Sequence, residues 1–338
     1  MRPVVGWASD RFGRRPLLLF GGALTVAALI AHLAVDSLAT FIAVRSLLGI
    51  AEAFFFVAAL AAISDMAPEE RRGEAINLGS LSVYIGLAVG PFIGELVLSS
   101  LGFDAAWLTA AGIAVLATAL TVLVPETAPG ILAGGRRSRT RVRLIHPAGI
   151  VPGLLILTGT WGMAGFFAFI PLHADAVGID SAGPLLALYA LIVIGLRIAF
   201  AKLPDQLGAV RLSGSALVMT GIGLTVMGLV DGSLGLIVGT ATFATGIAFM
   251  FPALMAVAVA RVEPGERGAV VGTTSAFLDL SFGLAPAVLG LLVGDGGYGG
   301  AFILSGAIAL AGALALFLVR GSMQPPGHAA PAAPTLAA

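Results

Sequence analysis

Apolar runs of the length that crosses a lipid bilayer recur along nearly the whole sequence. A helix needs about 20 apolar residues to cross the hydrocarbon core of a membrane. Ten runs approach or exceed that length, at approximately residues 17–35, 38–64, 75–98, 105–124, 149–171, 183–203, 212–230, 233–258, 269–293 and 300–319. The strands of a membrane barrel would instead alternate apolar and polar residues over about ten positions. The sequence therefore predicts an all-α membrane protein with about ten complete transmembrane helices.

Charged residues are scarce and unevenly placed. They make up 11% of the chain, whereas about a quarter of the residues in soluble domains are charged. Between the apolar runs, Lys and Arg occur at every second connection, while the intervening connections carry Asp without Lys or Arg. Basic connections of membrane proteins stay in the cytoplasm. We therefore expect a multi-pass protein of the plasma or inner membrane with both ends of this chain in the cytoplasm.

A constant offset of 195 residues relates two parts of the chain to each other. The matched positions in this register are Asp10 with Asp205, Gly13 with Gly208, Arg72 and Gly73 with Arg267 and Gly268, and Pro91 with Pro286. Matches in one register without a gap indicate an internal duplication, so we expect two pseudo-symmetric halves. The predicted boundaries are 1–128 for the first half, 129–147 for a basic cytoplasmic linker, 148–321 for a six-helix second half and 322–338 for a disordered tail.

The same offset places the start of the second half, near Pro147, opposite a position roughly 50 residues before Met1. That length corresponds to about two spans. We therefore expect the first half to lack the first two of twelve helices. A truncated chain, a mis-assigned start codon or a shortened gene would each leave such a first half.

The segment from Gly6 to Arg15 carries the first resemblance to a known family. Its residues GWASDRFGRR fit the pattern G-x-x-x-D-R-x-G-R-R, and in this the chain resembles the major facilitator superfamily, where the loop joins the second and third helices. The site residues implied by this resemblance are Gly6, Asp10, Arg11, Gly13, Arg14 and Arg15, with Asp205 and Gly208 as a degraded second copy. The resemblance implies a helical bundle of two halves that bind a small solute between them.

In relatives, the acid and the arginine of this loop join an acidic residue at the end of the fourth helix, which here would be Asp65. The resemblance thus implies that Asp10, Arg14 and Asp65 form a charge cluster that stabilises an outward-open state. Asp10 and Arg14 are four residues apart, which allows them to pair across one helical turn. The alternative is that these charges only set the topology.

A further motif lies within the second apolar run. Arg45 and Gly49 are similar to the fourth-helix pattern R-x-x-x-G, and Glu52 follows two helical turns after Arg45 on the same face. An arginine inside a span is costly unless it faces water or a partner. We therefore expect Arg45, Gly49 and Glu52 at the transport cavity, with a structural pair between Arg45 and Glu52 as the alternative.

The third apolar run resembles the fifth-helix pattern G-x-x-x-G-P-x-x-G-G of exporters that exchange solute for protons. The matching residues are Gly86, Gly90, Pro91 and Gly94, and Glu95 replaces the last glycine. The resemblance favours export. Small residues at this spacing also let helices approach closely, so helix packing alone would explain the three glycines.

Carboxylates inside apolar spans are the candidate proton carriers. Glu52, Glu95 and Asp279 are placed there. Burial in a low dielectric raises the pKa of a carboxyl group toward neutrality, which suits reversible protonation. The alternative for Asp279 is a capped structural acid.

The sequence lacks the residues for several other activities. It contains no Cys, which excludes disulfides and thiolate metal sites, and it has no nucleotide-binding or nucleophile-elbow motif. We therefore expect no enzyme activity, no cofactor and no metal. Because the basic residues are dispersed, we expect no nucleic-acid partner. The expected partners are a small-molecule substrate, protons and the lipid bilayer, with the chain as a monomer.

The function implied by the resemblance is secondary active transport by alternating access, with proton-coupled efflux of a drug-like or metabolite substrate. Aromatic and Met side chains in the spans suit a lipophilic solute. A proton-coupled importer of sugars or organic acids is the first alternative. A non-transporting, truncated membrane protein is the second.

Overall fold

The computed structural model describes residues 1–128, 144–179 and 181–319. The predicted tail and most of the predicted linker lie outside this description, as do the side chains of Leu87, Ala88, Pro91, Phe92, Glu95 and residues 294–296. All the regular elements of the described residues are helices, which confirms the all-α prediction.

In the described part of the first half there are four α-helices. They are α1 (Arg2–Phe12), α2 (Arg14–Ala31), α3 (Leu38–Met66) and α4 (Arg72–Thr121). The start of α3 shows why such helices begin where they do, because the Ser37 hydroxyl accepts a hydrogen bond from the backbone nitrogen of Thr40 at 3.2 Å and the Thr40 hydroxyl accepts one from the backbone of Ser37 at 3.1 Å. This reciprocal cap satisfies backbone donors that have no partner inside the helix.

The second half follows the same plan with one more long helix at its start. Its helices are α6 (Pro147–Ala176), α7 (Gly183–Ala199), α8 (Leu203–Leu207), α9 (Ala209–Leu229), α10 (Gly232–Val259) and α11 (Arg267–Val319). α6 begins with Pro147 at its first position, where a missing backbone N–H costs nothing.

The backbone breaks recur at the offset found in the sequence. Gly13, between α1 and α2, has a φ of 103°, and Gly208, between α8 and α9, has a φ of 79°. Within α4 and α11 the helix is broken at Gly102 (φ 82°) and at Gly297 (φ 63°). Glycine is the residue that adopts such angles without steric cost. Both pairs are 195 residues apart, so the duplication is visible in the fold itself.

Eight helices in the described residues are long and apolar enough to cross a membrane. They coincide with eight of the ten predicted spans. The predicted span 183–203 is the shorter α7, which has 17 residues, and the predicted span 75–98 is the part of α4 before Gly102.

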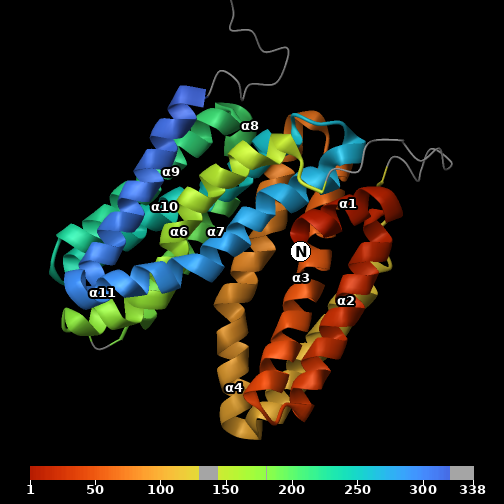
Figure 1. The fold of residues 1–338 in the computed structure, drawn as a ribbon, viewed down its shortest axis with the longest axis horizontal. Helices are drawn as coiled ribbons and strands as arrows, with labels where there is room; N and C mark the ends of the chain where they lie inside the picture. Colours follow the sequence, from red (N-terminus) through yellow and green to blue (C-terminus); the bar gives the residue numbers. More distant parts are fainter. Residues whose placement is uncertain (129–143, 180, 320–338) are drawn as a thin grey trace, which may run out of the picture.

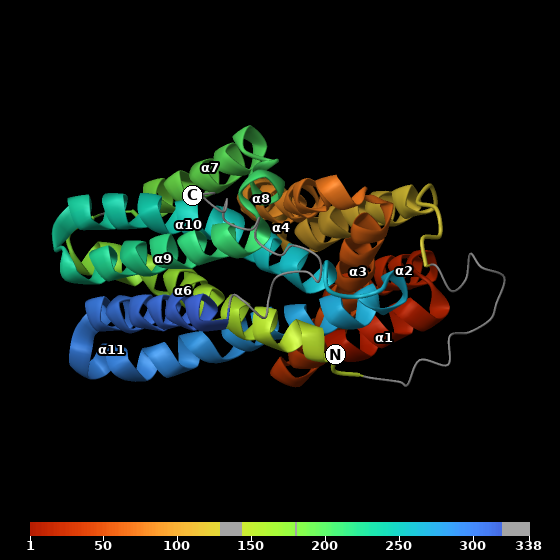
Figure 2. The same cartoon turned by 90° about the horizontal axis from the view of Figure 1, so that it is seen from above.

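The two halves meet at one end and diverge from there. In Figure 1, α2, α3 and α4 extend away from the helices of the second half, while α1 lies against the first part of α11. Figure 2 shows the second half as stacked layers of helices on one side and α1 to α3 on the other. The two repeats are therefore joined at this end, both where α1 meets α11 and where α4 meets α7 and α8.

The most tightly packed core lies in the second half. The rings of Phe166, Tyr189 and Phe243 contact one another with centroids 5.1 to 5.7 Å apart, a spacing typical of favourable aromatic pairs. By contrast, Leu101, directly before the break at Gly102, and Leu123, just after the end of α4, are largely exposed. In a bilayer, lipid covers such positions.

Candidate functional site

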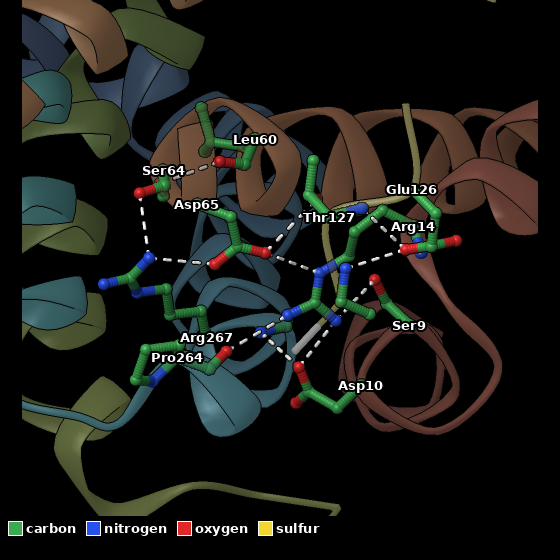
Figure 3. A network of polar contacts seen from close by, with 12 residues as sticks. Ser9, Asp10, Arg14, Leu60, Ser64, Asp65, Glu126, Thr127, Pro264 and Arg267 are labelled. Carbon is green, nitrogen blue, oxygen red and sulfur yellow. Dashed lines mark hydrogen bonds and ion pairs between the residues drawn. The ribbon is translucent and has the colours of Figure 1, made fainter. Parts of the chain in front are cut away.

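A chain of four charged side chains connects the two halves where they meet. Arg14 Nη1 lies 2.7 Å from Asp10 Oδ1, and Arg14 Nε lies 3.1 Å from Asp65 Oδ2. The other oxygen of Asp65 lies 2.9 Å from Nη1 of Arg267, on α11 (Figure 3). The structure thus brings the three predicted residues together and adds Arg267 from the second half. We call Asp10, Arg14, Asp65 and Arg267 the charge cluster.

Local structure explains how this cluster is assembled. α1 ends at Phe12 and α2 begins at Arg14, so the reversal at Gly13 leaves Asp10 and Arg14 facing each other. The start of α2 is held by Glu126, whose carboxylate accepts hydrogen bonds from the backbone nitrogens of Arg14 at 2.9 Å and Arg15 at 3.2 Å. Sequence reasoning missed Glu126, because it lies far along the chain in a connection without a motif.

Asp10 has a second role, at the start of α11. Its oxygens accept hydrogen bonds from the backbone nitrogens of Gly268 at 2.9 Å and Ala269 at 2.7 Å. A carboxylate at this position satisfies backbone donors and the positive end of the helix dipole. The approach requires glycine, because a Cβ at Gly268 would lie 2.7 Å from Asp10 Oδ1 and 2.6 Å from the Gly6 carbonyl oxygen.

The repeat reproduces this cap on the other side of the interface. Asp205 accepts hydrogen bonds from the backbone nitrogens of Gly73 at 2.9 Å and Glu74 at 2.8 Å, at the start of α4. Gly73 packs directly against the Asp205 carboxylate. Gly208 then turns the chain into α9. The degraded second copy of the motif therefore keeps its cap although it lost its arginines.

Burial shifts the pKa values of two ionisable groups at this end. Burial raises the pKa of Asp10, and the opposing effects of Arg14 and of the amide hydrogen bonds only partly offset it. Burial lowers the pKa of Arg72, and the neighbouring Arg267 lowers it further. These shifts follow from placing charges in a low-dielectric interface.

The remaining arginines of the loop motif lie outside the charge cluster. Arg11 is exposed, with its guanidinium over the rings of Trp7 at 5.4 Å and Phe12 at 5.7 Å. Arg15 donates from its side chain to the Val122 carbonyl at 2.8 Å. These two arginines therefore stabilise their own half.

A second group of charges lies further along the interface. Arg2 Nε lies 2.7 Å from Asp279 Oδ2, Arg2 Nη2 lies 3.0 Å from Glu52 Oε1, and the guanidinium carbon lies 4.4 Å from the centroid of the Phe56 ring. The Arg2 side chain is only 4% exposed, whereas those of Glu52 and Asp279 are 62% and 52% exposed. We call Arg2, Glu52 and Asp279 the Arg2 cluster.

The Arg2 cluster contradicts the alternative of a structural pair between Arg45 and Glu52. The structure pairs Glu52 with Arg2 and not with Arg45, whose guanidinium lies over the rings of Phe41 at 5.3 Å and Trp107 at 5.8 Å. Two of the predicted proton carriers, Glu52 and Asp279, share one cation. Sequence reasoning counted Arg2 only as a topological charge, although its position 195 residues before a second arginine within a span was an available signal.

A cavity of about 700 Å³ lies between α2, α3 and α4. Arg45, Gly49 and Glu52 line it together with mainly apolar side chains such as Phe55 and Leu48. Its lining residues all belong to the first half, whereas the resemblance implied a solute site between the halves. Because Glu52 lines the cavity and also bonds Arg2, the cavity adjoins the Arg2 cluster.

The duplication explains why this cavity exists. In the second half, α6 packs on the equivalent positions, since Gly153 contacts the Phe277 ring and Gly159 contacts the Met250 side chain. By the offset of 195, Phe277 and Met250 correspond to Ser82 and Phe55, which line the cavity. Residues 1–128 contain no helix equivalent to α6, so the corresponding space is open.

The glycines of the predicted helix-packing motif have no described helix against them, so their packing role stays a prediction. A Cβ added at Gly86, Gly90 or Gly94 would meet nothing within 4 Å, so no described helix packs against these glycines. By the offset of 195, Gly86 and Gly94 correspond to Ser281 and Leu289, which contact Thr160 and Gly165 on α6, and residues 1–128 contain no helix equivalent to α6. The side chains of Pro91 and Glu95 lie outside the described residues. In the part of the chain that the structure describes, no group of His, Asp and Glu is arranged to hold a metal ion.

Similar folds are known among solved structures. The human organic anion transporter MFSD10 superimposes with a TM-score of 0.80 at 20% identity, covering 93% of this chain and 80% of that one. A double-Trp mutant of XylE gives a TM-score of 0.79 at 16% identity, covering 94% and 82%. The E. coli fucose:proton symporter FucP gives 0.72 at 14% identity, covering 94% and 87%.

Sequence comparison identifies the family. The chain is 32% identical over 333 residues to an uncharacterised MFS-type transporter of Salmonella typhimurium, covering 94% of this chain and 83% of the relative. It is 28% identical over 320 residues to an uncharacterised MFS-type transporter of Burkholderia mallei, covering 92% and 77%. The family model of the Major Facilitator Superfamily matches residues 1–274 and 205–336. With a family match along nearly all of its length, this chain belongs to the major facilitator superfamily.

Proposed function

We propose that this chain exports a lipophilic small solute in exchange for protons, across a bacterial inner membrane. Membership of the superfamily indicates secondary transport of a solute by a multi-pass membrane protein. The observation that carries the proton-coupled proposal is the Arg2 cluster, in which Glu52 from one half and Asp279 from the other share one buried arginine.

The closed end of the interface supports alternating access. The charge cluster and the caps at Asp10 and Asp205 lie beside the Arg-rich connections, which the positive-inside rule assigns to the cytoplasm. The halves diverge away from this end (Figure 1). This arrangement supports an outward-open conformation, with the ends of this chain on the cytoplasmic side. Opening to the cytoplasm on the α1 side requires the Asp10 cap and the Asp65–Arg267 pair to separate.

The two carboxylates of the Arg2 cluster suit proton exchange. Their side chains are about half exposed, whereas the Arg2 side chain is buried. Protons from water can therefore reach the two acids while the arginine stays out of contact with water. Protonation of either acid removes its ion pair with Arg2 and leaves a weaker hydrogen bond from the guanidinium to a neutral carboxyl group. A proton therefore changes a contact between the halves, which is what coupling requires.

The solute class follows from the cavity beside Glu52. Its walls are mainly apolar, with Phe55 and Phe56 as the large rings. Such surfaces favour lipophilic or amphipathic solutes, whereas sugar recognition needs hydrogen-bonding side chains. The direction of transport rests on the resemblance of residues 86–95 to the fifth-helix motif of exporters.

Transport of a lipophilic cationic dye in proteoliposomes tests this proposal. An imposed proton gradient should drive dye movement against its own gradient, and an uncoupler should abolish it. Glu52→Gln and Asp279→Asn should each remove the dependence on the gradient, whereas the matched control Glu70→Gln, at an exposed loop residue, should not. Dye movement that ignores the uncoupler would reject proton coupling, and no movement at all would favour a non-transporting protein.

Proton-coupled import is the second candidate, because FucP is described as a fucose:proton symporter and shares this fold. It predicts that solute and protons move in the same direction. Uptake of a labelled sugar that is stimulated by an inward proton gradient would support import. The same measurement without sugar uptake leaves export as the function.

A further inference from the structure

Two buried arginines occupy equivalent places in the two repeats. Arg2 on α1 and Arg197 on α7 are 195 residues apart, and both side chains are buried. Each reaches the same position of the opposite half. Arg2 bonds Asp279 on α11, and the guanidinium of Arg197 lies 4.3 Å from the ring centroid of Tyr84 on α4. Asp279 and Tyr84 are again 195 residues apart, so the duplication has produced two arginine contacts across the interface.

The two arginines differ in what faces them. Arg2 bonds two carboxylates, those of Glu52 and Asp279. Arg197 donates to the hydroxyl of Ser80 at 2.7 Å and covers the Tyr84 ring, and in the described residues no carboxylate pairs with it. Its contacts are therefore with groups that stay neutral between acid and neutral pH. Of the two arginine contacts, only that of Arg2 involves groups that can take up a proton.

Close packing makes the Arg2 contact mechanically significant. A Cβ at Gly272 on α11 would collide with the Arg2 carbonyl oxygen, and one at Gly6 would collide with the Gly268 carbonyl oxygen. α1 and α11 are thus in backbone contact along the turns that carry Arg2. A change in the Arg2–Asp279 bond acts directly on this helix pair.

We propose that Arg2 is the positioning residue that converts protonation of Asp279 and Glu52 into separation of α1 from α11, while Arg197 holds α7 on α4 at every pH. The inference rests on the proposed proton coupling. A proton on Asp279 removes the ion pair between the halves and leaves only a weaker hydrogen bond, and Arg2 stays with Glu52 in its own half. The interface then opens on the α1 side and pivots on the Arg197 side.

Other titratable groups face the same helices and must be separated from this effect. Asp10 lies two turns after Arg2 on α1 and bonds the start of α11. His146 and Glu266 lie 3.6 Å apart beside the start of α11. Asp10→Asn and His146→Gln are therefore required as control variants.

Distances between spin labels test the proposal on the full chain, which contains no native Cys. One label pair, Arg11→Cys with Glu263→Cys, spans the α1 side, and a second pair, Glu70→Cys with Gln206→Cys, spans the α4–α8 side. All four residues are exposed. As the pH is lowered from about 8 into the range in which carboxyl groups take up protons, the first distance should lengthen and the second should stay constant.

Arg2→Gln should abolish this pH response, and its matched control Arg197→Gln should retain it. Asp279→Asn should abolish the response as well, which keeps the test decisive if Arg2→Gln does not fold. A normal response in Arg2→Gln or Asp279→Asn would overturn the proposal, as would its loss in Asp10→Asn or His146→Gln. The distances are measured without solute or gradient, so a retained response in a protein that fails to exchange solute for protons would reject the proposed function and not the role of Arg2.

Discussion

Asp10 and Asp205 each cap the first turn of a long helix in the opposite half of the molecule. In both cases the carboxylate oxygens lie 2.7 to 2.9 Å from two successive backbone nitrogens. The caps are reciprocal, since Asp10 of the first half holds α11 and Asp205 of the second half holds α4. They differ in exposure, because Asp205 is exposed and Asp10 is largely buried. We call the closed end of the interface, with its two caps, the closed face. Its two sides are therefore built alike but stabilised unequally.

Gly268→Ala should open the α1 side of this face. The new Cβ would lie 2.7 Å from the Asp10 carboxylate, so the cap cannot form. Hydrogen bonds to charged groups contribute about 1.5–3 kcal/mol each, so the population of the open face should rise by at least about tenfold. The readout is the rate at which maleimide labels Ser64→Cys, a position that is fully buried in the closed face. Gly265→Ala, where a Cβ meets open space, is the control. Equal labelling rates would contradict the prediction.

Gly73→Ala should have the same effect on the α4 side, but a smaller one. Its Cβ would collide with the Asp205 carboxylate. Because Asp205 is exposed, water already competes for its hydrogen bonds and screens its charge. Labelling of Ser64→Cys should therefore accelerate less than in Gly268→Ala. A larger acceleration would show that the exposed cap is the stronger one.

Asp65→Asn should be the most destabilising change in the charge cluster. Asp65 is the acid between Arg14 and Arg267, and its removal leaves two buried cations without that partner. Breaking a buried pair in this way costs about 3–5 kcal/mol. Thermal unfolding in detergent, followed by tryptophan fluorescence, measures the loss, with exposed Glu69→Gln as the control. Indistinguishable unfolding temperatures would rule out a stabilising role for Asp65.

Arg14→Gln should raise the pKa of Asp10 further. Burial already raises this pKa, and Arg14 lowers it through its charge and its hydrogen bond. A raised pKa means that the folded protein favours the neutral acid more than the unfolded chain does. The contribution of this raised pKa to the free energy of unfolding is thus present at low pH and is lost as the pH rises through the folded-state pKa of Asp10. Infrared titration of the carboxyl band, assigned with Asp10→Asn, measures the pKa. An unchanged or lower value in Arg14→Gln would contradict the expected direction.

The charge cluster shows how far sequence reasoning reached. The loop motif identified Asp10 and Arg14 through their local spacing, and Asp65 was added only by the resemblance to the family. Arg267 was visible only as the repeat partner of Arg72. Its bond to Asp65 depends on how the two halves pack, which spacing along the chain does not encode.

The Arg2 cluster illustrates the same limit. Glu52 and Asp279 were identified because charged groups are rare within apolar spans. Their shared partner is on a third helix, and nothing in the sequence between them indicates that contact. Instead, the spacing between Arg45 and Glu52 indicated a local pair that the structure does not contain.

Gly90→Ala should stabilise the 338-residue chain slightly. A Cβ at this position meets nothing within 4 Å, and alanine in a helix interior is favoured over glycine by about 0.5–1 kcal/mol. The matched comparison is Gly223→Ala, where the new Cβ would collide with the backbone nitrogen of Phe243 and push α9 away from α10. The thermal unfolding temperature should therefore rise in the first variant and fall in the second. If Gly90→Ala instead destabilises as strongly as Gly223→Ala, a helix must cover this face of α4 in the membrane, and the packing role expected from the glycine spacing would hold after all.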